Sequence, residues 1–334
     1  MLEWSAATRE RDLTAMADRR LDVLVIGGGI TGAGIALDAA SRGLSIALVE
    51  RDDFAAGTSG RSSRLIHGGV RYLRHGEFGL VYESLRERAT LRRLAPHLVR
   101  PLGFLVPTPE PSARMMTGIG LTLYDAVAVG RTVARHRRAS PDEMRHLAPT
   151  LRHASGGYLS FDCRTDDARL TLEILRQAVR HGALVANHAE VEAVLGQGRI
   201  TGARVLDRIT GRRLEIRAEA TINATGVWAD AVCGLAFPSR SRLRPSKGVH
   251  VVIDRERLPI RSAVLFRSLA ETSDFAFAIP WGPRVYVGTT DTPYDGPLAE
   301  PRVEPQEVQL LLASLERAFE GDVGAAPVRA SWAG

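Results

Sequence analysis

The sequence predicts an α/β fold in which a domain built on a parallel sheet is interleaved with a domain built on an antiparallel sheet. The chain has 334 residues, which is more than one average domain and suggests about two. A short apolar run, three glycines, a helical pattern and a second apolar run follow one another near the start, which is the order of a βαβ unit. Alternating apolar residues in the last third predict an antiparallel hairpin.

The βαβ unit is defined by its apolar spacing. Leu21–Ile26 is a β-rich apolar run, as expected of a buried parallel strand. Small apolar residues recur at helical spacing over Ala33–Ala40, and Gly43 ends that helix. Ser45–Val49 predicts the second strand, so the crossover between the strands should be right-handed.

The remaining elements follow from the same two periodicities. Three amphipathic helices are expected, near Phe78–Ala89, Leu170–Ala178 and Val308–Phe319. Strands are expected at 190–218 (three short ones), at Ala220–Ala224 and on both sides of a turn at Pro280–Pro283. The proline-spaced segment Pro96–Pro109 is expected to be irregular, and residues 112–150 are mixed.

The composition excludes several classes of protein. Apolar residues make up 45% and charged residues 25%, which excludes collagen-like, low-complexity and disordered chains. The formal charge is +6, but Lys247 is the only lysine among 44 basic residues. This arginine bias indicates a GC-rich bacterial genome, and acidic residues are interleaved throughout. We therefore interpret the excess charge as a solvated surface and expect no nucleic-acid partner.

The start of the chain and its cysteines indicate a compartment. Residues 1–18 are polar and predict a short helical extension rather than a signal peptide. The uncharged run Val23–Leu37 is broken by glycines and is shorter than the roughly 20 apolar residues of a membrane span. Two cysteines, Cys163 and Cys233, fit a reducing compartment and are expected to be buried thiols, and no metal-ligand spacing is present. The prediction is a cytoplasmic protein.

The run Gly27–Gly32 contains G-x-G-x-x-G between a predicted strand and a predicted helix, which is the context that a dinucleotide-binding motif needs. Gly27 allows the tight turn, Gly29 lets a pyrophosphate approach the backbone, and Gly32 lets the helix pack on the strand. The helix start offers free amides to phosphate. Glu50 ends the second strand, where it could bind a ribose diol, and an acid there favours FAD or NAD over NADP.

A second small-residue strand end, Ala224-Thr225-Gly226, follows Asn223. Such an end is typical of flavoproteins with two dinucleotide-binding folds, because small residues let the backbone lie beside the cofactor. This position favours FAD.

Five segments together resemble one family. In chain order, they are Gly27–Gly32, Gly57–Leu73, Phe161–Leu170, Ser246–Gly248 and Ile279–Asp291. The runs S-S-R-L-I-H-G-G-V-R-Y-L and D-D-A-R-L are the specific signals within them. From Leu21 onward the chain is similar to the FAD-dependent, quinone-linked glycerol-3-phosphate dehydrogenases. At Arg64 that family usually has lysine.

The resemblance implies oxidation of sn-glycerol 3-phosphate to dihydroxyacetone phosphate, with hydride transfer to flavin N5 and electrons passed to a membrane quinone. It implies a role for His67 as the base that takes the hydroxyl proton, since histidine titrates near neutral pH. Arg71 and Lys247 are the expected phosphate cations, and Tyr72 could add a hydroxyl contact. The implied cofactor contacts are Gly27, Gly29, Gly32, Glu50, Thr58, Ser59, Ser62, Ser63, Val191, Ala224, Thr225 and Gly226. Neither cysteine is expected to be a flavin attachment point.

The resemblance also implies a domain plan. A glutathione-reductase-like, D-amino-acid-oxidase-like FAD domain is expected at 19–75 and 155–236, and an antiparallel substrate domain at 76–154 and 237–326. Residues 327–334 would begin a return to the FAD domain that the sequence does not complete. We therefore expect a C-terminally truncated member of the family.

Several alternatives stay open at this point. The enzyme could instead be an oxygen-using glycerol-3-phosphate oxidase, or an amine or hydroxy-acid oxidase of the same superfamily. The chain could also be a non-catalytic flavoprotein fragment. Peripheral attachment to the inner face of the cell membrane is expected, with the basic stretch Arg131–Arg138 beside the apolar run Ile119–Val129 as a candidate contact, against a solvated helix face. A homodimer is left open.

Overall fold

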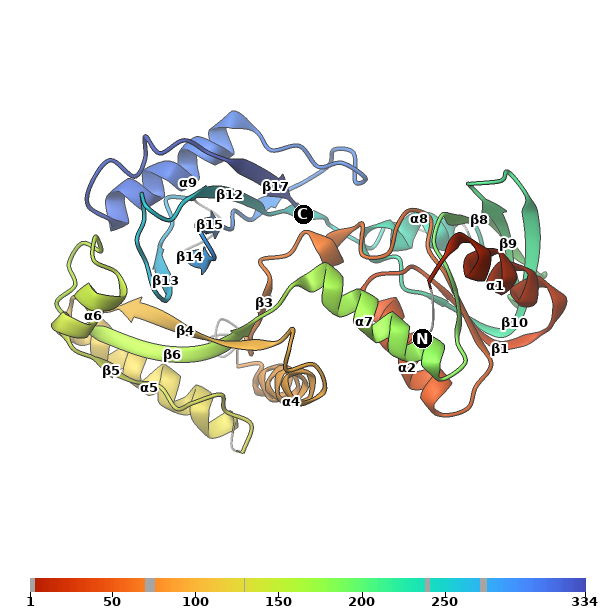
Figure 1. Ribbon diagram of the computed structural model, residues 1–334, viewed down its shortest axis with the longest axis horizontal. Coiled ribbons are helices and arrows are strands. Elements are labelled where there is room, and N and C mark those ends of the chain that lie inside the picture. Colours follow the sequence, from red (N-terminus) through yellow and green to blue (C-terminus); the bar gives the residue numbers. More distant parts are fainter. Residues whose placement is uncertain (1–3, 70–75, 129, 238–240, 271–274) are drawn as a thin grey trace. The chain divides into compact units, whose positions relative to one another are not determined.

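A computed structural model describes residues 4–69, 76–128, 130–237, 241–270 and 275–334. The chain divides into two compact units. The first unit consists of Met1–Ser62, Asp167–Pro245 and Gly296–Ala299, and the second of Ser63–Asp166, Ser246–Asp295 and Glu300–Gly334. Each unit carries its own main sheet (Figure 1). Each also has its own hydrophobic core.

The first unit contains the predicted βαβ arrangement within a six-stranded sheet of order β7-β2-β1-β10-β9-β8. Its strands are β1 Leu21–Ile26, β2 Ile46–Val49, β7 Leu184–Ala186, β8 Ala189–Leu195, β9 Gly202–Asp207 and β10 Arg213–Asn223. Helix α2, Ile30–Ser41, connects β1 to β2, and both β2 and β10 pair with β1 in parallel. The predicted βαβ unit is confirmed.

Strand β10 is one continuous element, where the sequence predicted two. Its first half, Arg213–Arg217, pairs antiparallel with β9, and its second half, from Ala218 to Asn223, pairs in parallel with β1. No glycine or proline interrupts residues 213–223, so nothing in the backbone ends the strand between the two pairings. The same strand therefore belongs to both the parallel and the antiparallel part of the sheet.

Helices cover both faces of this sheet. Helix α1, Ala6–Asp18, packs Leu13 and Met16 against Leu24 of β1 on one face. Helices α2 and α7, the latter Asp167–Arg180, cover the other face (Figure 1). Their apolar side chains pack there against Val25. The two faces follow from the alternation of side chains along a strand.

The predicted N-terminal helix is therefore present, but it is an integral layer of the first unit rather than an extension. Leu13 and Met16 are fully buried in the core of that unit. Arg9 of the same helix forms an ion pair of 2.5 Å with Asp207, whose side chain is also fully buried. The polar sequence concealed this role because only three residues of the helix are buried.

The second unit is built on a nine-stranded, mostly antiparallel sheet of order β17-β12-β15-β14-β13-β4-β6-β3, with β5 paired to β6. The strands are β3 Leu65–Ile66, β4 Arg100–Pro107, β5 Arg137–Ala139, β6 Gly157–Arg164, β12 Val249–Asp254, β13 Ala263–Arg267, β14 Phe275–Trp281, β15 Arg284–Gly288 and β17 Ala330–Ala333. Its helices are α4 Phe78–Leu94, α5 Pro111–Val127, α6 Pro141–Leu147 and α9 Pro305–Ala318. A short pair, β11 Ser246–Lys247 and β16 Thr292–Pro293, completes it.

Most predicted elements of the second unit are confirmed, and one is wrong. The predicted hairpin is β14–β15, and the predicted helices are α4 and α9. The segment expected to be irregular, Pro96–Pro109, contains β4. Pro101 and Pro107 are tolerated in β4 because β13 pairs only with Phe104 and Leu105, which leaves both prolines without a partner on that side.

The two units divide at other places than the domains expected from the sequence. The chain passes from the first unit to the second between Ser62 and Ser63 and returns between Asp166 and Asp167. The expected boundaries were near residues 75 and 155. The difference arises because β3 and β6 pair with each other in the second sheet. Within the described residues, no helix is long and apolar enough to cross a membrane.

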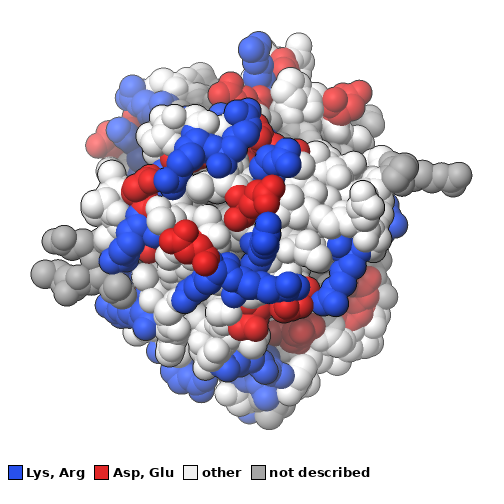
Figure 2. Space-filling model, turned by 90° about the vertical axis from the view of Figure 1, so that its right-hand side faces the viewer, with Lys and Arg blue, Asp and Glu red and all other residues white. Residues whose placement is uncertain are grey.

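Charged side chains of both signs share the surface of the molecule. Figure 2 shows Lys and Arg interleaved with Asp and Glu on one face. Arginines of β10 and of the β8–β9 turn pair with nearby carboxylates, as Arg213 does with Glu192 at 2.8 Å and Arg199 with Glu219 at 3.2 Å. Local pairing of this kind agrees with the interpretation of the arginine excess as a solvated surface.

Candidate cofactor and substrate sites

The glycine turn between β1 and α2 needs glycine at two positions. Gly27 has φ +113°, and a Cβ there would lie 2.5 Å from the Ala224 carbonyl oxygen. A Cβ on Gly32 would lie 1.9 Å from the carbonyl oxygen of Gly27. The turn, the first turn of α2 and the end of β10 therefore lie together, as the motif predicted.

The first amide of helix α2 donates a hydrogen bond to a serine hydroxyl from the loop after β2. Gly29 is the residue before the helix, and the Ile30 amide donates to Ser59 Oγ at 2.9 Å. Ser59 belongs to a short 3₁₀ helix, Thr58–Gly60. Thus Ser59, and with it Thr58, is placed at the positive end of the α2 dipole, where anions bind in proteins.

Glu50 lies beside the same turn. Its Oε2 accepts the Gly28 amide at 2.7 Å, and its Oε1 accepts the Asp52 amide at 2.8 Å. Two backbone amides therefore hold the carboxylate in place. Each oxygen keeps a further lone pair, so the group can still accept a hydroxyl hydrogen bond.

The strand end Ala224-Thr225-Gly226 is shaped by Asn223. The Asn223 Oδ1 atom accepts from the amide of Thr225 at 3.2 Å and from its hydroxyl at 2.6 Å. The Ala224 amide donates to the carbonyl of Ile26 at 2.8 Å. Gly226, at φ +57°, then begins a 3₁₀ turn, Gly226–Trp228. The predicted second strand end therefore lies next to the glycine turn.

Three other predicted cofactor residues lie in different surroundings. Ser62 donates from its amide and its hydroxyl to Asp167 Oδ2, at 3.1 and 2.8 Å. Val191 lies in β8 and packs against the hydrophobic core of the first unit rather than against the glycine turn. Ser63 is the first residue of the second unit, where its Oγ lies 2.9 Å from His250 Nε2.

His67 follows β3 and is exposed. The Gly69 amide donates to its Nδ1 at 3.0 Å. A ring nitrogen that accepts a hydrogen bond carries no proton, so the neutral His67 ring has its proton on Nε2. In this arrangement Nε2 can only donate a hydrogen bond. For His67 to accept a proton, the hydrogen bond between the Gly69 amide and Nδ1 would have to open.

Lys247 has a different partner from the one expected. Its Nζ lies 2.9 Å from Glu307 Oε2 and donates to the Arg302 carbonyl at 2.8 Å, and the residue is buried. Its charge is thus balanced inside the second unit, which favours a structural role over a phosphate contact. Arg71 and Tyr72, the other two expected substrate residues, lie outside the described residues.

His250 is a candidate that the sequence did not reveal. It lies in β12, is 3% exposed, and stacks on Trp332 with ring centroids 4.6 Å apart. Its Nδ1 is buried and has no hydrogen-bond partner in the described part of the chain. Burial, together with the positive charge of Arg64, lowers the pKa of His250 to about 4, so the ring is neutral near neutral pH. Its only signal in the sequence is a lone histidine within a run of valines.

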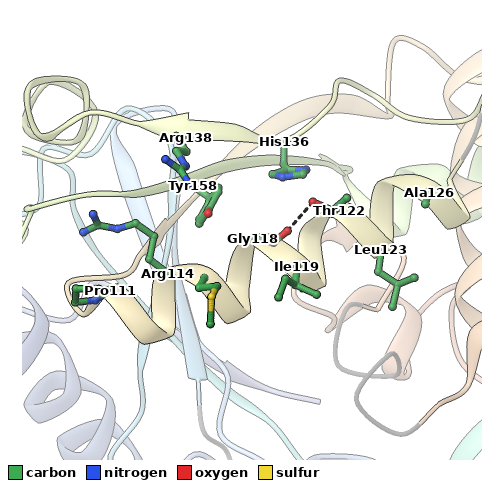
Figure 3. Close-up of a pocket in the computed structure, with 11 residues that line it drawn as sticks. Pro111, Arg114, Gly118, Ile119, Thr122, Leu123, Ala126, His136, Arg138 and Tyr158 are labelled. Atoms are coloured by element: carbon green, nitrogen blue, oxygen red, sulfur yellow. Dashed lines mark hydrogen bonds between the residues drawn. The ribbon is translucent and has the colours of Figure 1, made fainter.

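The second unit also has a groove along α5, with a cavity volume of about 810 Å³. Ile119 and Leu123 project from the helix and are 58% and 41% exposed. Figure 3 shows His136, Arg138 and Tyr158 beside this helix. The groove therefore combines an apolar helix surface with the cationic side chain of Arg138 at its edge.

Comparisons with known proteins show the family to which the chain belongs. A family model described as "DAO: FAD dependent oxidoreductase" matches residues 22–334. The alpha-glycerophosphate oxidase of Streptococcus pneumoniae is 38% identical over 345 positions, which cover 100% of this chain and 57% of the relative. The glycerol-3-phosphate dehydrogenase 2 of Mycobacterium tuberculosis is 40% identical over 342 positions, which cover 99% of this chain and 58% of the relative.

Solved structures show the same fold. The glycerol-3-phosphate dehydrogenase of Bacillus halodurans, complexed with FAD, has a TM-score of 0.78 at 36% identity and is matched over 99% of this chain and 59% of its own. The glycine oxidase of Bacillus cereus has a TM-score of 0.68 at 19% identity, which shows the fold alone. The chain thus spans 57% to 59% of the length of the glycerophosphate-enzyme relatives. Because the family model matches nearly the whole chain, the protein belongs to the DAO family of oxidoreductases, whose cofactor is FAD.

Proposed function

We propose that the chain carries the FAD-binding and substrate-binding parts of an enzyme that oxidises sn-glycerol 3-phosphate to dihydroxyacetone phosphate and passes electrons to a membrane quinone. The assignment of FAD binding rests on one observation: the glycine turn contacts both Glu50 and Ala224 in the first unit. The substrate half is supported by relatives that are named for glycerophosphate and align with 99% to 100% of the chain.

The residues of the first unit fit FAD. A Cβ on Gly29 would lie 3.0 Å from the Ser59 hydroxyl, so glycine is needed for the close approach of Ser59 to the start of α2, where we propose that the pyrophosphate binds. The Glu50 carboxylate is held where a ribose diol would follow, and the small residues Ala224 and Gly226 keep the strand end narrow. We assign to the cofactor Gly27, Gly29, Gly32, Glu50, Thr58, Ser59, Ser62, Ser63, Ala224, Thr225 and Gly226, and we assign Val191 to its outer edge.

The proposed chemistry divides between the two units. Bound FAD supplies the acceptor for the hydride that leaves the alcohol carbon. His67 is the proposed base for the hydroxyl proton, once its Nδ1 is released from the Gly69 amide. His250 is the second candidate, because its Nδ1 atom has no hydrogen-bond partner among the described residues.

We propose Arg71 as the main phosphate cation, since a guanidinium matches the geometry of phosphate, with Tyr72 as a hydroxyl contact. Lys247 could reach a phosphate only by leaving Glu307. We therefore propose that it instead fixes strand β11 at the edge of the site.

The second candidate for the acceptor is oxygen. It is favoured by relatives of 36% to 38% identity that are named oxidases, such as that of Streptococcus pneumoniae. An oxidase of another small alcohol or amine, or a fragment without activity, would leave the flavin oxidised when glycerol 3-phosphate is added.

Anaerobic addition of glycerol 3-phosphate to the FAD-loaded protein should bleach the oxidised-flavin absorbance. We expect His67→Gln to slow this reduction by about 10²- to 10⁴-fold, the usual contribution of a general base, while flavin content is unchanged. His97→Gln, an exposed histidine of the second unit, is the matched control. Stopped-flow absorbance gives the rates.

Three outcomes separate the alternatives. No bleaching of the FAD-loaded wild type would contradict the substrate assignment. A normal rate in His67→Gln together with a large loss in His250→Gln would move the base to His250. Hydrogen peroxide formed in air, in amounts equal to the substrate consumed, would identify oxygen as the acceptor in place of a quinone.

We also propose that the α5 surface contacts an anionic membrane surface from the cytoplasmic side. The exposed apolar residues Ile119 and Leu123 lie beside Arg138, which pairs apolar insertion with attraction to acidic lipid.

Ile119→Ser should lower binding to phosphatidylglycerol vesicles about tenfold, since a buried aliphatic side chain contributes about 1.5–3 kcal/mol. Ile209→Ser, which changes an equally exposed isoleucine of the first unit, should leave binding unchanged in a flotation assay. Equal binding of both variants would contradict this surface.

A further inference from the structure

Three buried polar side chains form a cluster that contacts the loop His67–Gly69, and this cluster has no role in the proposed function. Arg88 of α4, Tyr124 of α5 and Asp162 of β6 are 1%, 2% and 8% exposed. Arg88 Nη1 pairs with Asp162 Oδ1, and Tyr124 donates to the same oxygen at 3.1 Å. Three elements that are distant in the sequence therefore converge on one carboxylate.

The Tyr124 hydroxyl connects this group to the loop. It accepts the Gly68 amide at 2.8 Å. Burial and then the negative charge of Asp162 raise the pKa of Tyr124, so the phenol keeps its proton and donates it to Asp162. The direction of the chain is therefore fixed: the Gly68 amide donates to Tyr124, and Tyr124 donates to Asp162.

The loop is seated closely on the hydroxyl. A Cβ on Gly68 would lie 2.4 Å from Tyr124 Oη and 2.4 Å from Leu85 Cδ2, so only glycine allows this approach. The neighbouring residues on both sides carry the proposed chemistry, since Gly69 donates to the His67 ring. A hydrogen bond at Gly68 therefore fixes the backbone between the imidazole and the amide that orients it.

The ionic character of the group is also informative. Apolar residues of similar volume often replace a buried ion pair without loss of stability, so a buried pair is weak support for a purely stabilising role. Burial raises the pKa of Asp162, and the positive charge of Arg88 opposes this rise.

We propose that Tyr124, held by Arg88 and Asp162, is a positioning residue that sets the orientation and tautomer of His67 through the Gly68 amide. The expected effect on the rate of flavin reduction rests on the proposed function. The expected effect on the tautomer of the His67 ring does not. Tyr124 acts through the loop and is not expected to touch substrate.

The test compares Tyr124→Phe with Tyr158→Phe. Tyr158 is a second buried tyrosine against α5, and its hydroxyl lies at Gly118, six residues from Tyr124 and so about 9 Å along the helix. In ¹⁵N spectra of histidine-labelled protein, wild type should show His67 with a bare, hydrogen-bonded Nδ1 and a protonated Nε2. His67→Gln identifies the signals. Tyr124→Phe should shift them toward an average of both tautomers, and Tyr158→Phe should not.

The kinetic readout is separate. Tyr124→Phe should lower the limiting rate of flavin reduction at least tenfold, with half-saturation by substrate within twofold. The Gly68–Tyr124 bond holds the loop even when Nδ1 is released from the Gly69 amide, so its loss misplaces the imidazole at the moment it acts as a base. Unchanged His67 signals in Tyr124→Phe would overturn the inference whether or not the protein oxidises glycerol 3-phosphate. If Tyr124→Phe does not fold, Asp162→Asn retains the shape of the group and should shift the same signals. A failure of wild-type flavin reduction with shifted His67 signals would contradict only the proposed function.

Discussion

Replacing Gly32 with alanine should weaken FAD binding and destabilise the first unit. The new Cβ would lie 1.9 Å from the Gly27 carbonyl oxygen, a backbone atom that cannot rotate away. Helix α2 would have to move from β1, and the amides at its start would move with it. We expect a loss of about 3 kcal/mol in the free energy of unfolding, the upper end for overpacking, and at least tenfold weaker FAD binding.

The matched control lies two residues further along the same helix. Gly34 is exposed, and a Cβ there meets nothing within 4 Å. Gly34→Ala should therefore stabilise the protein by up to about 1 kcal/mol, because alanine favours a helix over glycine. Urea unfolding and flavin-fluorescence titration measure the two effects. A Gly32→Ala protein that binds FAD like wild type would show that the close contact of helix and turn is not needed.

The second large effect is expected at the N-terminal helix. Arg9→Met should destabilise the first unit by about 3–5 kcal/mol, since it leaves the fully buried carboxylate of Asp207 without its cation. Arg20→Met breaks an ion pair with Glu219 whose side chains are about half exposed, and it should cost less than about 1 kcal/mol. Adding Asp207→Asn to Arg9→Met should restore part of the loss.

The Arg9 effect should also depend on pH. Burial opposes ionisation of Asp207, but hydrogen bonds from Arg9 and Thr210 outweigh it and lower the pKa of the carboxyl to about 2. A lowered carboxyl pKa contributes stability above the unfolded value, and that contribution is lost as the pH falls toward 2. The difference between wild type and Arg9→Met should therefore shrink between about pH 4 and pH 2. A constant difference over this range would contradict the ionic origin of the effect.

The parts of the structure that the sequence predicted are local. The βαβ unit, the glycine turn and the placement of Glu50 depend on residues within about thirty positions, and each has a turn or periodicity that marks it. The hairpin β14–β15 was predicted for the same reason. The predictions of FAD as the cofactor and of His67 as a site residue came instead from the family resemblance.

The parts that escaped prediction depend on distant partners. Strand β4 forms despite its prolines because β6 and β13 pair with it from other regions of the chain. Lys247 looked like a free cation until Glu307, sixty residues later, was placed beside it. His250 gives no periodic signal, and its isolation is visible only once Trp332 covers it. The pattern of neighbouring residues in the sequence does not show which distant side chains come into contact in the folded protein.

The pairing of β1 with β10 has a consequence for the order of folding. Strand β1 ends at Ile26, but its neighbour β10 starts at Arg213, and the whole Ser63–Asp166 segment of the second unit lies between them. The Arg9–Asp207 pair spans a separation of 198 residues. Contacts of such high sequence separation form slowly, because the chain entropy of closing the loop is lost before the contacts compensate for it. During synthesis the N-terminal segment therefore leaves the ribosome with an unpaired edge on β1, and the first unit closes only after Arg213–Asn223 has been made.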